Sequence, residues 1–204
     1  MLTIGGERLE LARLAMGPGA DRDLVLCAGG LVLGIVASLL WPAVGHPLLG
    51  LALLVLVGWL AFHDVARRTI TGTGLPRFAG ACMLAGYAWL AVAGALWLTA
   101  GPTVTGARYD AVVHAVFLGF TLSMILAHAP VILPAVLHRP LPYTPVLYVP
   151  AVLLHGSLVL RLWIGDALGI HVAWQIGGVL NVTALLLFVV VAASASLRAA
   201  RRTA

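Results

Sequence analysis

The sequence predicts an all-α membrane protein, a bundle of six transmembrane helices. Of its 204 residues, 62% are apolar and 9% are charged, whereas soluble domains are about 45–50% apolar and about 25% charged. Apolar runs long enough to cross a bilayer recur six times, with short loops between them. The 12 basic residues are all arginines and lie mainly between these runs. This composition excludes a soluble enzyme or a nucleic-acid-binding domain, so the expected environment is the lipid bilayer.

The first three spans end at recognisable signals. Residues 24–41 end at a Trp-Pro pair, residues 47–66 at an Asp-Val-Ala-Arg-Arg string, and residues 78–100 before a Gly-Pro pair. Residues 1–22 carry charges of both signs and lack the basic start, apolar stretch and cleavage site of a signal peptide. We expect them to form a cytoplasmic segment in which residues 7–16 can form an interfacial amphipathic helix.

The last three spans are predicted at residues 110–133, 143–164 and 172–197. The first of these can continue, kinked, past its two prolines. Because the connections are short, spans adjacent in sequence are expected to pack as antiparallel neighbours in one domain over residues 1–204.

Arginine placement predicts the topology. With six spans, the N-terminal segment, the loops after the second and fourth spans and the C-terminal tail fall on one side, and the opposite loops hold only Arg108. The positive-inside rule then places both termini in the cytoplasm. A multi-pass protein of a bacterial-type inner (plasma) membrane follows from this pattern.

Histidines are the main candidate functional residues. Ionisable groups inside lipid are costly and mark functional sites, and His63, His114, His128 and His155 lie within predicted spans. His114 and His128 are 14 residues apart, which on a regular α-helix is about 40° short of four turns and about 21 Å along the axis. Both would project from one face, as needed to give one axial ligand to each of two haems. This predicts one or two b-type haems with His114 and His128 as iron ligands.

The sequence does not identify the second ligand of each haem iron. At the inner site, either His63 or His155 can face the iron, and at the outer site His171, His46 or a shifted His155 can do so. Arg161, near the outer end of the fifth span, can bind haem propionates. The other candidates for propionates are Arg108 on the outer side and Arg67, Arg68 and Asp64 on the inner side. Each residue also has a structural interpretation, since buried histidines hydrogen-bond neighbouring helices and arginines extend to the membrane surface.

A family resemblance rests on the fourth span. The string HAVFLGFTLSMILAHAP resembles a helix of the NnrS-type haem proteins and is more distantly similar to histidine-bearing helices of haem–copper oxidase subunit I. The match covers roughly residues 109–135, with a weaker likeness through His155, and the H-x13-H spacing is similar to that of diheme cytochromes b. The resemblance implies a helical membrane protein that binds b-type haem through His114 and His128. Copper and oxygen reduction are not carried over, because the chain has no adjacent His-His pair and no His-Pro-Glu-Val-Tyr string.

The sequence is compatible with three candidate functions. The first is a haem subunit that carries electrons across the bilayer between a partner oxidoreductase and the quinone pool, working beside another subunit or as a homodimer. It would be an electron-transfer subunit rather than a complete enzyme, and no catalytic residue is assigned. The second is an NnrS-like haem or metal protein of nitric oxide stress. The third is a cofactor-free transporter or assembly subunit. Asp110 and Asp166 are expected at the outer surface, so no carboxylate pair is predicted within a span.

Overall fold

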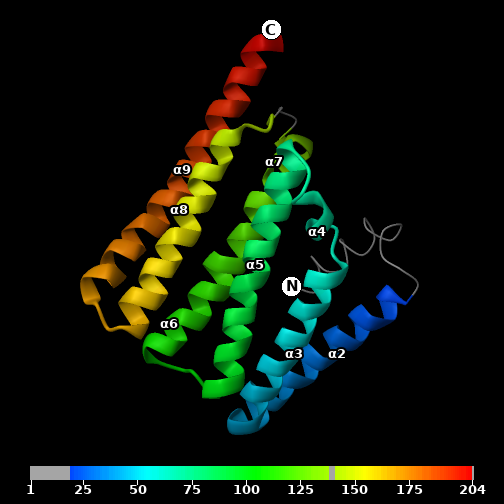
Figure 1. Cartoon of the computed structure of the whole chain (residues 1–204), viewed down its shortest axis with the longest axis vertical. Helices are drawn as coiled ribbons and strands as arrows, with labels where there is room; N and C mark the ends of the chain where they lie inside the picture. Colours follow the sequence, from blue (N-terminus) through cyan, green and yellow to red (C-terminus); the bar gives the residue numbers. More distant parts are fainter. Residues whose placement is uncertain (1–18, 138–140, 204) are drawn as a thin grey trace.

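The computed structural model describes residues 19–137 and 141–203, and this part of the chain contains helices and no strand (Figure 1). Six helices are long and apolar enough to cross a membrane, which confirms the predicted six-helix membrane fold. These candidate spans are Ala20–Leu40, Pro42–His63, Gly74–Ala100, Gly106–Val136, Pro145–Ala167 and His171–Arg201. The chain is therefore a multi-pass membrane protein.

Several spans are subdivided. The first half contains α2 (Ala20–Leu40), α3 (Pro42–His63), the short α4 (Ala66–Thr69) and α5 (Gly74–Ala100). The fourth span consists of α6 (Gly106–His114), the π-helix η1 (Ala115–Thr121) and α7 (Leu122–Leu137). The last two spans consist of the 3-10 turn η2 (Pro145–Leu147), α8 (Tyr148–Val159), the π-helix η3 (Leu160–Ala167) and α9 (His171–Thr203).

The helices form two hairpins around a central pair (Figure 1). The α2–α3 hairpin packs against α5, α5 also packs against η1 and α7, and α8 and α9 form the second hairpin. The connections at Trp41, at residues 101–105 and at residues 168–170 lie at one end of the bundle, which we call the loop end. The opposite end, with α4, the start of α5 and the C-terminus, is the terminal end. The cytoplasmic location of both termini stays a prediction, and the predicted interfacial helix at residues 7–16 lies outside the described residues.

Small residues bring the helices close together. A methyl group added at Gly34 would lie 2.8 Å from the Cα of Leu49, and one at Gly50 would lie 2.5 Å from the carbonyl oxygen of Gly94. Close backbone approach of this kind is typical of helix packing in lipid, where van der Waals contact replaces the hydrophobic effect between helices. Large apolar side chains such as Leu39 are exposed, as expected for surfaces that face lipid tails.

Both π-helices depart from the regular helices that the sequence predicted. In η1, the N–H of Leu122 bonds to the carbonyl of Phe117, five residues earlier, in place of the α-helical four. The hydroxyl of Thr121 donates to Val116 O, again five residues earlier. Such segments are rare and occur frequently at functional sites. One follows His114 directly and the other contains Arg161.

Candidate functional site

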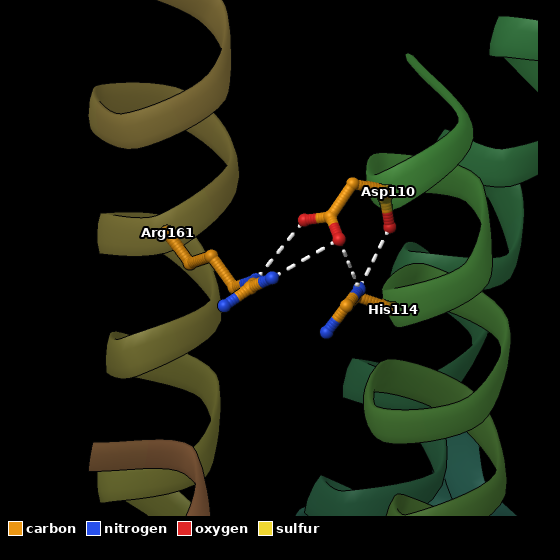
Figure 2. Close-up of polar contacts among 3 residues, drawn as sticks. All are labelled: Asp110, His114 and Arg161. Atoms are coloured by element: carbon orange, nitrogen blue, oxygen red, sulfur yellow. Dashed lines mark hydrogen bonds and ion pairs between the residues drawn. The ribbon is translucent and has the colours of Figure 1, made fainter. Parts of the chain in front are cut away.

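An ion pair between two helices dominates the loop end. Arg161 Nε and Nη2 donate to Asp110 Oδ2 and Oδ1, each at 3.0 Å (Figure 2). Arg161 is only 8% exposed, and its Cζ lies 4.3 Å from the centroid of the Trp174 ring. A bidentate carboxylate and an aromatic face together stabilise a guanidinium that has left water. Arg161 is thus bound inside the bundle, and two of its three nitrogens are already engaged by a carboxylate of the chain itself.

Two glycines make this packing possible. A methyl group at Gly177 on α9 would lie 2.7 Å from Arg161 Cβ, and one at Gly165 on η3 would lie 2.7 Å from Trp174 Cα. With hydrogen at both positions, η3 and α9 touch backbone to backbone. This close approach seats the Trp174 ring against the Arg161 guanidinium.

His114 lies on the other side of Asp110 (Figure 2). Its Nδ1 is 2.8 Å from the backbone oxygen of Asp110 and 3.3 Å from Asp110 Oδ1, both one helical turn earlier. A carbonyl oxygen can only accept, so Nδ1 carries a proton and donates it. In the described part of the chain, Nε2 has no hydrogen-bond partner. The arrangement fixes the orientation of the His114 ring and leaves the lone pair of Nε2 able to bind a metal ion or a hydrogen-bond donor.

Asp166 adds a second carboxyl group to the ion pair. It lies on η3 and interacts with the side chain of Asp110, and its Oδ2 is buried without a hydrogen-bond partner among the described residues. Two carboxylates near one another repel when both are ionised, and the Arg161 guanidinium, which binds Asp110, offsets part of that repulsion. The sequence analysis predicted no carboxylate pair within a span, and in this respect it was wrong, because the ends of two spans bring Asp110 and Asp166 together. Its placement of both residues at the outer surface stays a prediction. The (i, i+4) spacing of Asp110 and His114 was the one available signal.

An apolar pocket of about 420 Å³ adjoins the ion pair. It lies between α5, α6 and η3, and its lining residues are Val92, Leu96, Ala107, Arg108, Ala111, Leu162, Trp163, Asp166 and Ala167. Its polar edge is formed by Arg108 and Asp166, and the rest of its wall is apolar. We call Asp110, His114, Arg161 and Asp166 the loop-end cluster, and of these four residues Asp166 lines the pocket. Ala111 and Leu162, the chain neighbours of Asp110 and Arg161, also line it, so a space that suits an apolar group adjoins the ion pair.

His155 occupies a different position, in the middle of the bundle. Trp89 Nε1 donates to His155 Nδ1 at 3.0 Å, and His155 Nε2 lies 3.5 Å from Ser123 Oγ. Nδ1 is therefore the acceptor and Nε2 carries the proton. With both nitrogens engaged, His155 joins α5, α7 and α8 and offers no lone pair to an iron in this arrangement. It fits the role of a structural histidine and does not fit that of a haem ligand.

The remaining predicted ligands lie apart from this cluster. His128 Nδ1 is 2.6 Å from Met124 O and His63 Nδ1 is 2.9 Å from Trp59 O, each one turn earlier. His63 is exposed and stacks on the ring of Trp59, with ring centroids 5.0 Å apart. His171 is exposed at the start of α9 and stacks on Trp174 at 5.6 Å, which places it near the loop-end cluster.

Residues 1–197 match the family described as Domain of unknown function (DUF8744). The chain belongs to this family. A search of curated proteins and a search of solved structures found no match to it. The family description assigns no reaction or ligand to DUF8744, so functional inference for this member depends on its own geometry.

Segment η1 changes the relation between His114 and His128 in this DUF8744 chain. Their predicted shared face assumed a regular α-helix. A π turn contains about one residue more than an α turn, and one extra residue rotates the following helix by about 100°. The angular offset between the two side chains becomes about 140° instead of about 40°. The 14-residue spacing therefore no longer predicts a shared face, and each histidine has to be assessed as a separate site.

Asp64 has a structural role in place of the propionate contact considered for it. Its Oδ2 accepts from Tyr87 Oη at 2.7 Å and its Oδ1 accepts from Ala66 N–H at 2.8 Å. The residue is 4% exposed. It therefore joins the end of α3 to α4 and α5, whereas the sequence analysis considered it for a propionate at the inner surface. Of the other propionate candidates on that side, Arg67 lies over the ring of Phe62, with 5.7 Å from Cζ to the ring centroid.

Proposed function

We propose that the chain is a b-type haem-binding membrane subunit that passes electrons between a partner oxidoreductase and the quinone pool. The observation that carries the proposal is the setting of His114. Its Nδ1–H is held by Asp110, which is the hydrogen bond that iron-ligating histidines make to fix their tautomer and orientation. Its Nε2 is without a partner among the described residues and can serve as an axial ligand. When bound, haem would supply one-electron chemistry.

The other histidines differ in how well they suit this role. His128 has the same Nδ1 bond to a carbonyl one turn back, and it lies in the string that carries the family resemblance. His171 is exposed and stacks on Trp174, which lies against Arg161, and it is our candidate for the second ligand beside His114. His155 is withdrawn as a ligand, because Trp89 and Ser123 use both of its nitrogens. A second copy of the chain or a partner subunit is the source of any ligand that the chain itself lacks.

Propionate binding is assigned to Arg108 rather than Arg161. Arg161 already uses Nε and Nη2 on Asp110. Arg108 is exposed and lines the apolar pocket at the same end. A flat apolar ring with anionic substituents is compatible with a site that has an apolar wall and a basic edge.

The visible spectrum of the purified full-length protein tests the proposal. Protein from haem-replete cells should show a Soret band and sharp α-bands after reduction by dithionite, and a pyridine haemochrome assay gives the haem content. His114→Ala should lower the content, and His171→Ala should convert a six-coordinate iron to a five-coordinate one. His155→Gln is the matched control and should keep the haem. A colourless, folded wild-type protein contradicts the proposal. A haem with an open position that binds carbon monoxide or nitric oxide would instead favour the NnrS-like function.

A second candidate function rests on Asp110 and Asp166. Two interacting carboxyl groups beside a buried arginine are typical of proton-binding sites in transporters, so a cofactor-free, proton-coupled transporter is the alternative. It predicts a colourless protein whose infrared spectrum contains a carbonyl band from a protonated carboxyl group. Asp166→Asn should remove this band, and Arg108→Gln should leave it in place. Persistence of the band in Asp166→Asn would exclude this site as its source.

A further inference from the structure

A second pocket, of about 410 Å³, lies at the terminal end of the bundle. It is formed where α5 and α8 begin, beside the segment that follows α4. Its lining residues are Ile70, Thr73, Gly74, Arg77, Ala81, Tyr143 and Tyr148. This pocket is at the opposite end of the bundle from the loop-end cluster and takes no part in the proposed haem site.

Positive charge in this pocket is not neutralised by the described residues. Arg77 is exposed and makes no ion pair or hydrogen bond within the described part of the chain. The nearby acid, Asp64, is turned to Tyr87 and to the N–H of Ala66. Of the remaining described acids, Asp21 and Asp23 lie in the first turn of α2, and Asp110 and Asp166 belong to the loop end. Arg67 and Arg68 on the neighbouring α4 add to the basic character of this side.

Three hydroxyl groups, of Thr73, Tyr143 and Tyr148, also line the pocket. The rings of Tyr143 and Tyr148 both pack against the buried Phe78, with centroids 6.2 Å and 5.1 Å away, which fixes their positions. Neither phenol hydroxyl has a hydrogen-bond partner in the described ranges, and the Thr73 side chain caps no N–H of α5. One guanidinium and three hydroxyls thus line a single pocket. A ligand rich in anionic oxygens would satisfy them.

We propose that this pocket binds the phosphate group of an anionic ligand. Phosphate supplies several acceptor oxygens and the negative charge that Arg77 lacks. The same group is carried by the headgroup of an acidic lipid and by soluble phosphate compounds. The lipid is favoured by location, because the pocket opens where two spans begin, and Ile70 and Ala81 give it an apolar wall beside its donors. Basic pockets between membrane helices bind acidic lipid headgroups in this way.

Native mass spectrometry of the full-length protein in detergent tests the site. The probes are dioctanoyl phosphatidylglycerol, dioctanoyl phosphatidylcholine and inorganic phosphate. The wild type should bind phosphatidylglycerol at least about tenfold more tightly than phosphatidylcholine, as expected for one charge-assisted contact. Arg77→Gln should abolish this preference. Tyr148→Phe, which keeps the ring against Phe78, should weaken it by a few-fold.

Arg198→Gln is the matched control, because Arg198 is an exposed arginine on α9 that bonds to Ser194 and does not line the pocket. It should leave the preference unchanged. Displacement of phosphatidylglycerol by millimolar inorganic phosphate would identify a soluble phosphate compound as the ligand, and retention would identify the lipid. The proposal is overturned if the wild type shows no preference for phosphatidylglycerol. It is also overturned if Arg77→Gln and Arg198→Gln lose the preference equally, since general surface charge would then explain the binding.

Discussion

Breaking the Asp110–Arg161 pair should cost the protein much of its stability. The perturbation is a double-mutant cycle of Asp110→Asn, Arg161→Gln and the double variant. Asparagine keeps the size of aspartate and removes its charge, whereas glutamine is shorter than arginine and also loses the contact with Trp174. That additional loss occurs in both variants that carry Arg161→Gln and cancels in the coupling energy. The cycle therefore isolates the free energy of the charged contact between the two side chains.

The magnitude follows from burial and geometry. Removing one partner of a buried ion pair costs about 3–5 kcal/mol. The side chain of Asp110 is 25% exposed and that of Arg161 is 10% exposed, so water reaches the carboxylate and the lower end applies. Arg161→Gln also loses the contact with Trp174, worth about 0.5–2 kcal/mol. Together these two losses give about 3.5–5 kcal/mol for Arg161→Gln, and we expect about 2 kcal/mol for the coupling between the two positions.

Reversible unfolding in mixed micelles of detergent and dodecyl sulfate measures these values. Arg108→Gln is the matched control at the same end of the bundle, because Arg108 is exposed, and it should change the free energy of unfolding by less than about 0.5 kcal/mol. Neutral hydrogen bonds between membrane helices couple by about 0.6 kcal/mol on average. A coupling at or below that value would show that the charges add nothing to an ordinary polar contact, and the reasoning would be refuted.

Three further substitutions test the packing, each by the same unfolding measurement. Tyr87→Phe removes the hydroxyl that donates to buried Asp64 and should cost about 1–3 kcal/mol; a loss below about 0.5 kcal/mol would argue against this role. Gly119→Ala would place a methyl group 2.5 Å from Trp89 Cβ and should cost about 1–3 kcal/mol through overpacking. Gly156→Ala is the control, because no atom lies within 4 Å of the added methyl group. It should leave the free energy of unfolding unchanged or raise it by up to about 1 kcal/mol. Equal losses of unfolding free energy at both glycines would contradict the close contact at Gly119.

The six spans could be predicted from the sequence because few backbone conformations are stable in the hydrocarbon of a bilayer. A backbone in hydrocarbon has to satisfy its own hydrogen bonds, so each long apolar run has to be a helix. The exact ends of the helices were harder to predict from the sequence. The second span was expected to reach Ala66, but α3 ends at His63, because the Asp64 carboxylate turns inward to Tyr87, 23 residues further along the chain. That turn depends on a tertiary contact that no local pattern encodes.

The candidate site was predictable only in part. His114 stood out because ionisable groups are rare in spans, and Asp110 is visible one turn before it. The contact of Asp110 with Arg161 joins positions 51 residues apart, and finding it requires knowledge that α6 lies against η3. The two π-helices have no compositional signature. The face shared by His114 and His128 was therefore computed on a helix geometry that the chain does not have.

Three costly features coincide at the loop end. Arg161 is a buried charge within a span, Asp166 Oδ2 is buried without a partner among the described residues, and the two helices that meet there each contain a π segment. Each feature alone has a structural explanation, since ion pairs join helices and π segments adjust helix register. Their coincidence around His114 is harder to explain by packing, because an apolar contact would join α6 and η3 at lower cost in lipid. The two proposed functions both draw on this cluster, through the Nε2 of His114 in one and the Asp110–Asp166 pair in the other. The loop end is therefore the place where the first functional substitutions should be made.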